Sequence, residues 1–433
     1  MDIKVISALG LHGACATTCI TVQNTRGIQR VISVDPSIVE EMIDVLRRDL
    51  DIRSVKTGAL PLPRHVEIVA ELVEDTKIPL VVDPVMRAKD GTVLTSDESI
   101  EVMKRRLLPM ATVVTPNAEE VKAFVGEVPR SVEDAKRLAR KIAEQYGVKV
   151  VVVKGGHLEE LRAIDVAYVD GTYILLEKPR EPRVVRGTGC CFSAALASAL
   201  AMGMGIEEAL RLAKNVTYLA IAYAYRVSDG PLVPATLASL EIDVHAYRSL
   251  SMVQQAVEEI LRHGEVFKEL VPEVGTNVVY AYDPRYVRSI DDVASIEGRI
   301  VKTRRGIVVA GRVAMGGSSH VARALLKAME LDPTVRAAMN LKPHPKLIEG
   351  LRRLGKEVVF IDRREEPEEI RRVEGASIPW IVEEAFRRAG KLPTAIYDAG
   401  DVGKEPMLRL FARDPTELVK LVLKAMGIEE QST

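Results

Sequence analysis

The sequence predicts an α/β protein in which a doubly wound sheet is followed by a second, smaller α/β domain. Two observations predict this class. Short β-branched runs alternate with amphipathic stretches over the first 240 residues, and the alternation resumes after a break near residue 235. The chain has 433 residues, which is too long for one ordinary core and fits two or three domains.

The composition excludes several classes of function. The net charge is −1, so the whole chain lacks the basic field that nucleic acids or anionic membranes attract. There is no signal-peptide pattern and no apolar run of about 20 residues, so we expect a cytoplasmic protein whose partners are small molecules. The four cysteines lack zinc spacing and fit reduced thiols in a cytoplasm. The sequence leaves open whether the protein forms a homodimer.

Each element of the first domain is predicted from its pattern. The expected strands are residues 16–22, 53–57, 78–83, 112–115 and 148–154. The expected helices are residues 37–50, 64–74, 99–108 and 194–204. The run at 148–154 is nearly all apolar, which is typical of a parallel sheet covered on both faces. Ligands of such sheets bind outside the carboxyl ends of the strands, so polar residues there are the first candidates for a site.

Polar side chains follow three of these strands. Asp83 ends one strand, Asn117 and Glu120 follow the next, and Lys154 ends the third. Each has a structural interpretation as well: Asp83 could belong to a turn, Asn117 could cap a helix, and Lys154 could be a solvated strand end. Taken together they supply two carboxylates suited to Mg²⁺ and a cation suited to phosphate.

A glycine turn completes this candidate site. Gly187 and Gly189 permit a tight turn before a small, apolar helix, whose unpaired N–H groups and positive dipole end favour an anion. Cys190 lies in the same field, which favours its thiolate and would let it accept a proton from a hydroxyl that attacks a bound phosphate. A structural turn with buried cysteines is the alternative. Together with the strand ends, the turn predicts phosphoryl transfer.

Residues 1–240 resemble hydroxymethylpyrimidine phosphate kinase, a ribokinase-like enzyme of thiamine biosynthesis. The motifs that carry the resemblance are residues 7–10, 22–25, 56–58, 83–86, 115–120, 154–157 and 187–190. The resemblance implies ATP as phosphate donor, Mg²⁺ as cofactor, Cys190 as the catalytic residue, and Asp83 and Glu120 at the metal. It also implies nucleotide binding by Asn117, Lys154, Gly187, Thr188 and Gly189. Substrate binding is implied for Asp2, Gln23 and Met86.

The chain departs from this family at its start. The family opens with a strand and a glycine-rich loop, whereas residues 1–4 match only the positions after that loop. We therefore expect the first strand of the sheet to be missing. Either translation starts upstream, or this copy has lost part of its substrate site; the aggregation hazard of an unpaired strand favours the upstream start. Arg186 and Cys191 stand where the family usually has His and Thr.

The second domain is expected to span residues 249–433. The prolines at 231 and 234 break the helical pattern, residues 236–245 show no clear period, and residues 249–262 have helical apolar spacing. Further on, a polar turn precedes an expected helix at residues 321–329. Its N–H groups, hydroxyls and dipole end make a phosphate site, although a serine-capped helix with an incidental histidine is the alternative. The turn consists of Gly316, Gly317, Ser318, Ser319 and His320.

Residues 249–427 resemble the thiamine-phosphate synthase domain found fused behind this kinase. The markers are residues 316–320, 336–340 and 398–406. The resemblance implies Arg299 and His320 as catalytic residues, which would neutralise the diphosphate leaving group. It also implies substrate binding by the glycines and serines of the polar turn, by Asn340 and by Lys404.

We therefore expect a bifunctional enzyme. The first domain would phosphorylate hydroxymethylpyrimidine phosphate with ATP, and the second would condense the diphosphate with thiazole phosphate to give thiamine phosphate and diphosphate. The alternative is a thiamine-phosphate sensor with a degenerate kinase body, because the same kind of domain occurs in thiamine-responsive regulators. No helix-turn-helix pattern is visible, which favours the enzyme. A sugar or pyridoxal kinase with an added domain is disfavoured because Cys190 stands at the base position.

Overall fold

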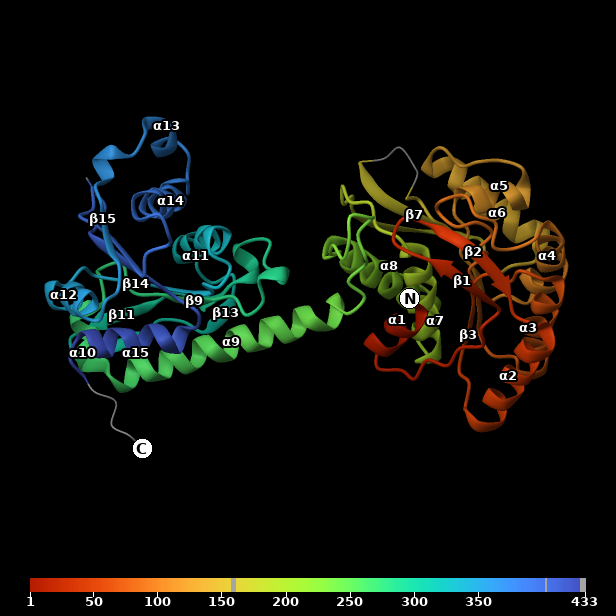
Figure 1. Ribbon diagram of the computed structural model, residues 1–433, viewed down its shortest axis with the longest axis horizontal. Helices are drawn as coiled ribbons and strands as arrows, with labels where there is room; N and C mark the ends of the chain where they lie inside the picture. Colours follow the sequence, from red (N-terminus) through yellow and green to blue (C-terminus); the bar gives the residue numbers. More distant parts are fainter. Residues whose placement is uncertain (157–160, 402, 429–433) are drawn as a thin grey trace. The chain divides into compact units, whose positions relative to one another are not determined.

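The computed structural model divides the chain into two compact units, Met1–Leu240 and Glu241–Thr433 (Figure 1). It describes residues 1–156, 161–401 and 403–428. His157 and Val402, which belong to two of the predicted motifs, lie outside the described residues. Within these ranges, every helix is too short or too polar to span a bilayer.

The first unit is built on a six-stranded sheet. Four of its strands, β3 to β6, run parallel, and β7 and β8 continue the sheet antiparallel. The strands are β3 (Val55–Thr57), β4 (Leu80–Val82), β5 (Val113–Val114), β6 (Val150–Val153), β7 (Arg162–Val169) and β8 (Thr172–Pro179). The predicted doubly wound sheet is confirmed, with an antiparallel pair that was not predicted. A two-residue turn at Asp170 and Gly171, both with positive φ, joins that pair.

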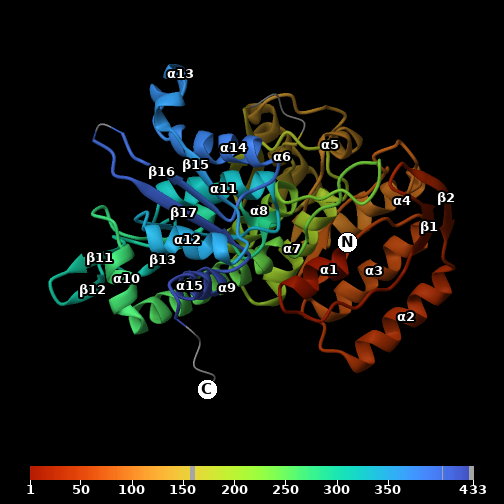
Figure 2. The same ribbon diagram turned by 60° about the vertical axis from the view of Figure 1, so that its left-hand side comes forward.

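Helices cover both faces of this sheet (Figure 2). One face packs against α3 (Pro63–Thr76), α4 (Asp97–Val102), α5 (Ala118–Val125) and α6 (Val132–Tyr146). The other packs against α1 (Asp2–Ala8), α7 (Thr188–Ala201) and α8 (Ile206–Ala222). Successive strand residues point to opposite faces, so Val81 lies in one core and Val82 in the other. The small side chains of α7 allow it to be buried on nearly every side.

The predicted strand at residues 16–22 does not belong to this sheet. It is β1 (Cys19–Gln23), and it pairs with β2 (Ile28–Ser33) in a separate two-stranded ribbon that leads into α2 (Pro36–Asp49). The expectation of a strand was right and its placement was wrong. Its apolar Ile20 and Val22 are exposed, so the ribbon buries neither face of β1 deeply.

The second unit contains a seven-stranded sheet that is antiparallel except between β15 and β16. In sheet order its strands are β13 (Val313–Met315), β10 (Ala294–Ile296), β9 (Val278–Tyr280), β14 (Ala337–Leu341), β17 (Met407–Ala412), β16 (Ala395–Asp398) and β15 (Val358–Ile361). A hairpin of β11 (Ile300–Thr303) and β12 (Gly306–Val309) stands apart from it.

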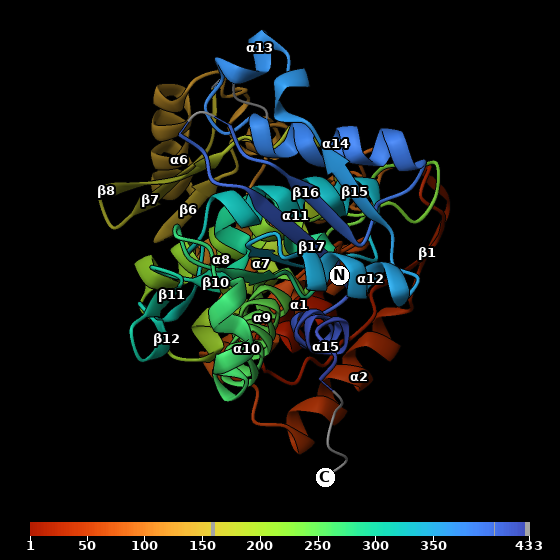
Figure 3. The same cartoon turned by 90° about the vertical axis from the view of Figure 1, so that its left-hand side faces the viewer.

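This sheet is also sandwiched between helices (Figure 3). One face packs against α9 (Ala238–Arg262), α10 (Gly264–Leu270), α12 (Pro345–Arg353) and α15 (Pro415–Ala425). The other packs against α11 (His320–Leu331) and α14 (Ser377–Ala389), beside the short α13 (Glu368–Arg371). Helix α9 starts eleven residues before the predicted residue 249. Leu240, Val244 and Tyr247 of its first turns are exposed, so no buried stripe marked this part of the helix in the sequence.

Candidate active sites

The polar strand ends of the first unit meet at one edge of its sheet. Asp83 follows β4 and is 1% exposed. Lys154, which follows β6, donates to Asp83 Oδ1 at 3.0 Å and lies 3.9 Å from Glu120 Oε2. Because β4, β5 and β6 are parallel neighbours, their carboxyl ends bring these side chains together.

A second lysine extends this group of charges. Lys56, in β3, donates to Asp2 Oδ2 at 2.8 Å and lies 3.7 Å from Asp83 Oδ2. Charges therefore alternate in the order Asp2, Lys56, Asp83, Lys154 and Glu120, which we call the charge row. Burial opposes the charged form of Lys56, but the nearby Cys190, Asp83 and Asp2 raise its pKa overall. No role for Lys56 was predicted from the sequence, although it lies in one of the kinase motifs.

The glycine turn lies against the charge row. Gly187 has a φ of +79° and precedes Thr188, the first residue of α7. A Cβ added to Gly189 would lie 3.1 Å from Lys154 Nζ, so the lysine ammonium reaches the turn. From the next turn of α7, the Ser193 hydroxyl donates to Asp83 Oδ2 at 3.0 Å. The structure thus brings together the glycine turn, Lys154 and Asp83, as the strand-end argument predicted; Ser193 was missed.

The surroundings of Cys190 favour its thiol, whereas the sequence predicted the thiolate. Burial, followed by the charge of Asp83, raises the pKa of Cys190 to about 12. Lys56 and Lys154 act in the opposite direction without reversing the shift. The helix N-terminus alone favours the thiolate, but desolvation of a buried charge outweighs that field.

Asn117 and Glu120 form a reciprocal cap at the start of α5. Asn117 Oδ1 accepts from the Glu120 N–H at 3.0 Å, and Glu120 Oε2 accepts from the Asn117 N–H at 2.8 Å. The capping interpretation of Asn117 is therefore correct for this structure. Burial raises the pKa of Glu120 to about 7; Lys154 opposes the rise and Asp83 adds to it. A role for either residue at the nucleotide stays a prediction.

The residues present do not fit a direct magnesium site. Both oxygens of Asp83 are bonded, one to Lys154 and the other to Ser193. One oxygen of Glu120 is held by the α5 cap. No group of three or more His, Cys, Asp or Glu side chains suited to a metal occurs among the described residues. Direct coordination by Asp83 would require Lys154 or Ser193 to move.

Two predicted substrate residues lie outside the charge row. Gln23 is exposed at the end of β1, and Met86 is a buried core residue that is 7% exposed. The ribbon of β1 and β2 is nevertheless tied to the segment before the glycine turn, because Arg186 donates to the Arg26 carbonyl at 2.7 Å. Asp90 also accepts from the Ile28 N–H at 2.7 Å.

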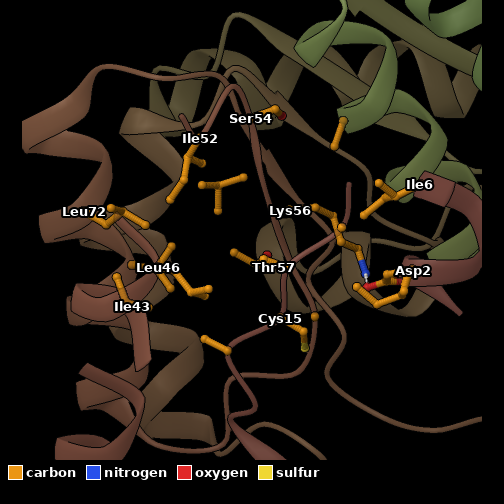
Figure 4. Close-up of a pocket in the computed structure, with 18 of the residues that line it drawn as sticks. Asp2, Ile6, Cys15, Ile43, Leu46, Ile52, Ser54, Lys56, Thr57 and Leu72 are labelled. Carbon is orange, nitrogen blue, oxygen red and sulfur yellow. Dashed lines mark hydrogen bonds and ion pairs between the residues drawn. The ribbon is translucent and has the colours of Figure 1, made fainter. Parts of the chain in front are cut away.

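A cavity of about 570 Å³ borders the charge row on the side of β3 (Figure 4). Asp2 and Lys56 line one side of it. Apolar side chains of α2 and α3, such as Leu46 and Leu72, line the opposite side. β3 is the first strand in the order of the described sheet, so its outer edge adjoins this cavity.

In the second unit, the polar turn leads into α11 as predicted. Gly316 has a φ of +73°, and His320 is the first residue of the helix. A Cβ added to Gly317 would lie 3.0 Å from the Glu297 N and 3.1 Å from Ser295 Oγ, so a side chain here would crowd both atoms. The Ser295 hydroxyl is buried and has no hydrogen-bond partner among the described residues.

Arg299 has strained backbone and a fixed side chain. Its φ is +72°, which is unusual for a residue other than glycine and marks a site that the surroundings hold in place. Arg299 Nη1 donates to the Val274 carbonyl at 2.5 Å. The Val274 N–H in turn donates to Glu405 Oε2 at 3.2 Å. Glu405 therefore anchors the loop that orients Arg299.

Asn340 supports the same loop from within β14. It is 7% exposed; its Nδ2 donates to the Gly275 carbonyl at 2.9 Å, and its Oδ1 accepts from the Asn277 N–H at 2.7 Å. The side chain is thus committed to protein contacts here, and its role toward substrate stays a prediction. Lys404 is exposed in a turn with Asp401, with its backbone N–H bonded to the Asp401 carbonyl at 2.8 Å.

The charges of three arginines act on His320. Burial lowers the pKa of His320, and the charges of Arg299, Arg323 and Arg409 lower it further. Arg409 is buried and bonded to Asp398 Oδ2 at 2.7 Å. Neither Arg323 nor Arg409 was predicted from the sequence. A single charged residue in the apolar strand Met407–Ala412 was a signal for Arg409, whereas Arg323 resembles any other helix-surface arginine.

Two family models match the chain. The model for phosphomethylpyrimidine kinase matches residues 1–234, and the model for thiamine-phosphate synthase ThiN matches residues 252–424. The bifunctional thiamine biosynthesis protein ThiDN of Methanocaldococcus jannaschii is 26% identical over 97% of this chain and 93% of its own length. The hydroxymethylpyrimidine/phosphomethylpyrimidine kinase of Rhizobium meliloti is 36% identical over 53% of this chain and 86% of its own.

Solved structures agree for the first unit. The pyridoxal kinase of Staphylococcus aureus, solved with pyridoxal, is 29% identical, with a TM-score of 0.51 over 55% of this chain and 87% of its own. The pyridoxal kinase of Bacillus subtilis, solved with ADP, is 27% identical, with a TM-score of 0.50 over 55% of this chain and 92% of its own. The first unit is therefore ribokinase-like, as predicted. The chain belongs to the phosphomethylpyrimidine kinase family and, with its thiamine-phosphate synthase domain, is a bifunctional enzyme of thiamine biosynthesis.

Proposed function

We propose that the first unit transfers the γ-phosphoryl group of ATP to the phosphate of hydroxymethylpyrimidine phosphate, giving the diphosphate and ADP. The observation that carries this proposal is the meeting of the glycine turn, Lys154 and Asp83 at one sheet edge. The N–H groups at the start of α7 bind phosphate oxygens, and Lys154 neutralises charge on the transferred group. Asp83 holds both lysines of the charge row in place.

The role of Cys190 depends on whether the phosphoryl acceptor is a hydroxyl or a phosphate. A hydroxyl acceptor must lose a proton as it attacks, and Cys190 is a side chain at the turn that would receive it, with Lys56 favouring the resulting thiolate and burial opposing it. A phosphate monoester has a second pKa near 6 and is largely deprotonated at neutral pH, so its oxygen attacks without such help. The high pKa of Cys190 in this structure suits a kinase that acts on the phosphate.

We propose that the second unit joins this diphosphate to thiazole phosphate. The thiazole nitrogen bonds to the pyrimidine methylene carbon as the bond from that carbon to the diphosphate oxygen breaks, and diphosphate leaves with the electron pair. Arg299 and His320 stabilise the charge that builds on the leaving diphosphate. The polar turn at the start of α11 binds its phosphate oxygens, while Lys404 contacts the thiazole phosphate.

The sensor alternative gains nothing from these observations. The relative that spans 97% of this chain carries the name of a bifunctional biosynthetic protein. A ligand sensor also has no use for a kinase site whose charged side chains are assembled at one sheet edge.

The test supplies the intact protein with each pair of substrates separately. ATP and hydroxymethylpyrimidine phosphate should give ADP, and the chemically prepared diphosphate with thiazole phosphate should give thiamine phosphate. Magnesium is present in both assays, and each product is measured by chromatography. Thiamine phosphate binding without either turnover would leave the sensor as the correct assignment.

A further inference from the structure

A buried ion pair lies outside the proposed chemistry of the first unit. Lys214, in α8, donates to Asp165 Oδ2, in β7, at 2.7 Å, and each residue is 8% exposed. Taking two charges out of water is costly, and apolar residues of similar volume often serve stability equally well. A contribution to general stability therefore does not explain this pair.

The second oxygen of Asp165 bonds to the active-site backbone. Asp165 Oδ1 accepts from the Gly155 N–H at 2.8 Å, and that bond is buried. Gly155 directly follows Lys154, whose own N–H donates to the Pro116 carbonyl at 2.9 Å. The main chain at residues 154 and 155 is thus fixed from both sides, by the end of β5 and by β7.

This anchoring sets the position of the Lys154 ammonium. The side chain reaches Asp83 at 3.0 Å and lies against Gly189 of the phosphate-binding turn. Without Asp165, the Gly155 N–H would be a buried donor with no acceptor, and the segment would shift to find another partner. A shift of about 1 Å in a catalytic group can cost roughly 100-fold in rate.

We infer that Asp165, held by Lys214, is a positioning residue for Lys154 and so controls how the kinase site engages the phosphates of ATP. This inference rests on the proposed kinase function. It requires an acceptor at Gly155, and it does not require charge at residues 165 and 214.

The experiment compares two double variants that differ in that acceptor. Both variants carry Lys214→Met. The first adds Asp165→Asn, which keeps an oxygen acceptor for the Gly155 N–H. The second adds Asp165→Leu, which keeps a similar volume but has no acceptor. We expect the Leu variant to raise the KM for ATP by about 10-fold to 100-fold and to lower kcat, while the Asn variant stays close to wild type. The KM for hydroxymethylpyrimidine phosphate and the synthesis of thiamine phosphate from preformed diphosphate should not change.

A neighbouring pair provides the matched control. Lys178, in β8, donates to Asn215, in α8, at 2.7 Å, and among the described residues neither side chain is hydrogen-bonded to the segment after β6. Lys178→Met with Asn215→Leu should leave the KM for ATP unchanged. If the Leu variant does not fold, Asp165→Glu keeps the ion pair and displaces the acceptor by one methylene, and it should still raise the KM for ATP.

Equal KM values for ATP in the Asn and Leu variants would overturn the inference, as would losses of kcat that follow the melting temperature with KM unchanged. An unchanged KM in the Asp165→Glu variant would overturn it as well. These results are distinct from a failure of the proposed function, in which the wild-type protein itself would form no ADP with hydroxymethylpyrimidine phosphate.

Discussion

In the first unit, cations and carboxylates alternate along the charge row, with Lys56 between Asp2 and Asp83 and Lys154 between Asp83 and Glu120. In the second, no carboxylate among the described residues is paired with the side chains of Arg299, Arg323 or His320. Paired charges hold their positions before a ligand arrives, whereas unpaired cations gain most when an anion binds. The charges of the kinase site are thus balanced within the protein, whereas we expect those of the synthase site to be balanced by an anionic substrate.

The largest effect that separates the two sites is expected at Cys190. Cys190→Ala should lower turnover with free hydroxymethylpyrimidine by about 100-fold to 10,000-fold, because the attacking hydroxyl loses its proton acceptor. Turnover with hydroxymethylpyrimidine phosphate should fall much less, since that oxygen is already deprotonated. The measurement is the rate of ADP formation with each acceptor, and the factor by which the substitution lowers it is compared between the two. An equal fall for the two would show that Cys190 acts by packing, and synthesis in the second unit should be unaffected in either case.

A smaller but still large effect is expected at Arg299. Arg299→Ala should lower thiamine phosphate synthesis by about 100-fold, because a guanidinium contact with the developing diphosphate charge is lost. Binding of thiamine phosphate should weaken less, since that product lacks the leaving group. Turnover and equilibrium binding are measured on the same preparation, with Arg304→Ala as control because Arg304 lies in the β11–β12 turn. Equal losses in turnover and binding would argue for a sensor.

Diphosphate alone should stabilise the protein through the second site. A ligand at 100 times its Kd adds about 2.7 kcal/mol, which raises the melting temperature of a unit of this size by about 5 to 10 °C. Arg299→Ala should remove most of that shift and Lys154→Ala should leave it in place. If Lys154→Ala removed the shift and Arg299→Ala did not, the diphosphate site would belong to the first unit and the assignment would be wrong.

The smallest predicted effect is on pH dependence. Burial and three arginines lower the pKa of His320 from its ordinary 6.5, and a bound diphosphate favours the protonated ring. Affinity for diphosphate should therefore rise as the pH falls toward that lowered pKa and become constant below it. Calorimetric titrations at several pH values should show a weaker rise in His320→Gln, which cannot gain the proton. Identical pH profiles for the two proteins would exclude His320 from the anion site.

The sequence predicted the alternation of elements and the residues at the ends of β4, β5 and β6, because both follow from local patterns. It did not place β1, since a run of alternating residues fits a separate ribbon as well as a sheet. The β7–β8 hairpin was missed although Asp170-Gly171 is a known turn signal. The Cys190 thiol, Lys56 and Asp165 depend on burial and on partners from distant segments, which no local pattern contains.

The most direct measurement of the central claim, that the chain carries two separate active sites, uses variants that inactivate one site each. Lys154→Ala should make thiamine phosphate only when it is supplied with hydroxymethylpyrimidine diphosphate. Arg299→Ala should form ADP and accumulate that pyrimidine diphosphate. A mixture of the two variants with ATP, hydroxymethylpyrimidine phosphate and thiazole phosphate should then form thiamine phosphate. No product from the mixture, or loss of ADP formation in Arg299→Ala, would contradict two independent sites.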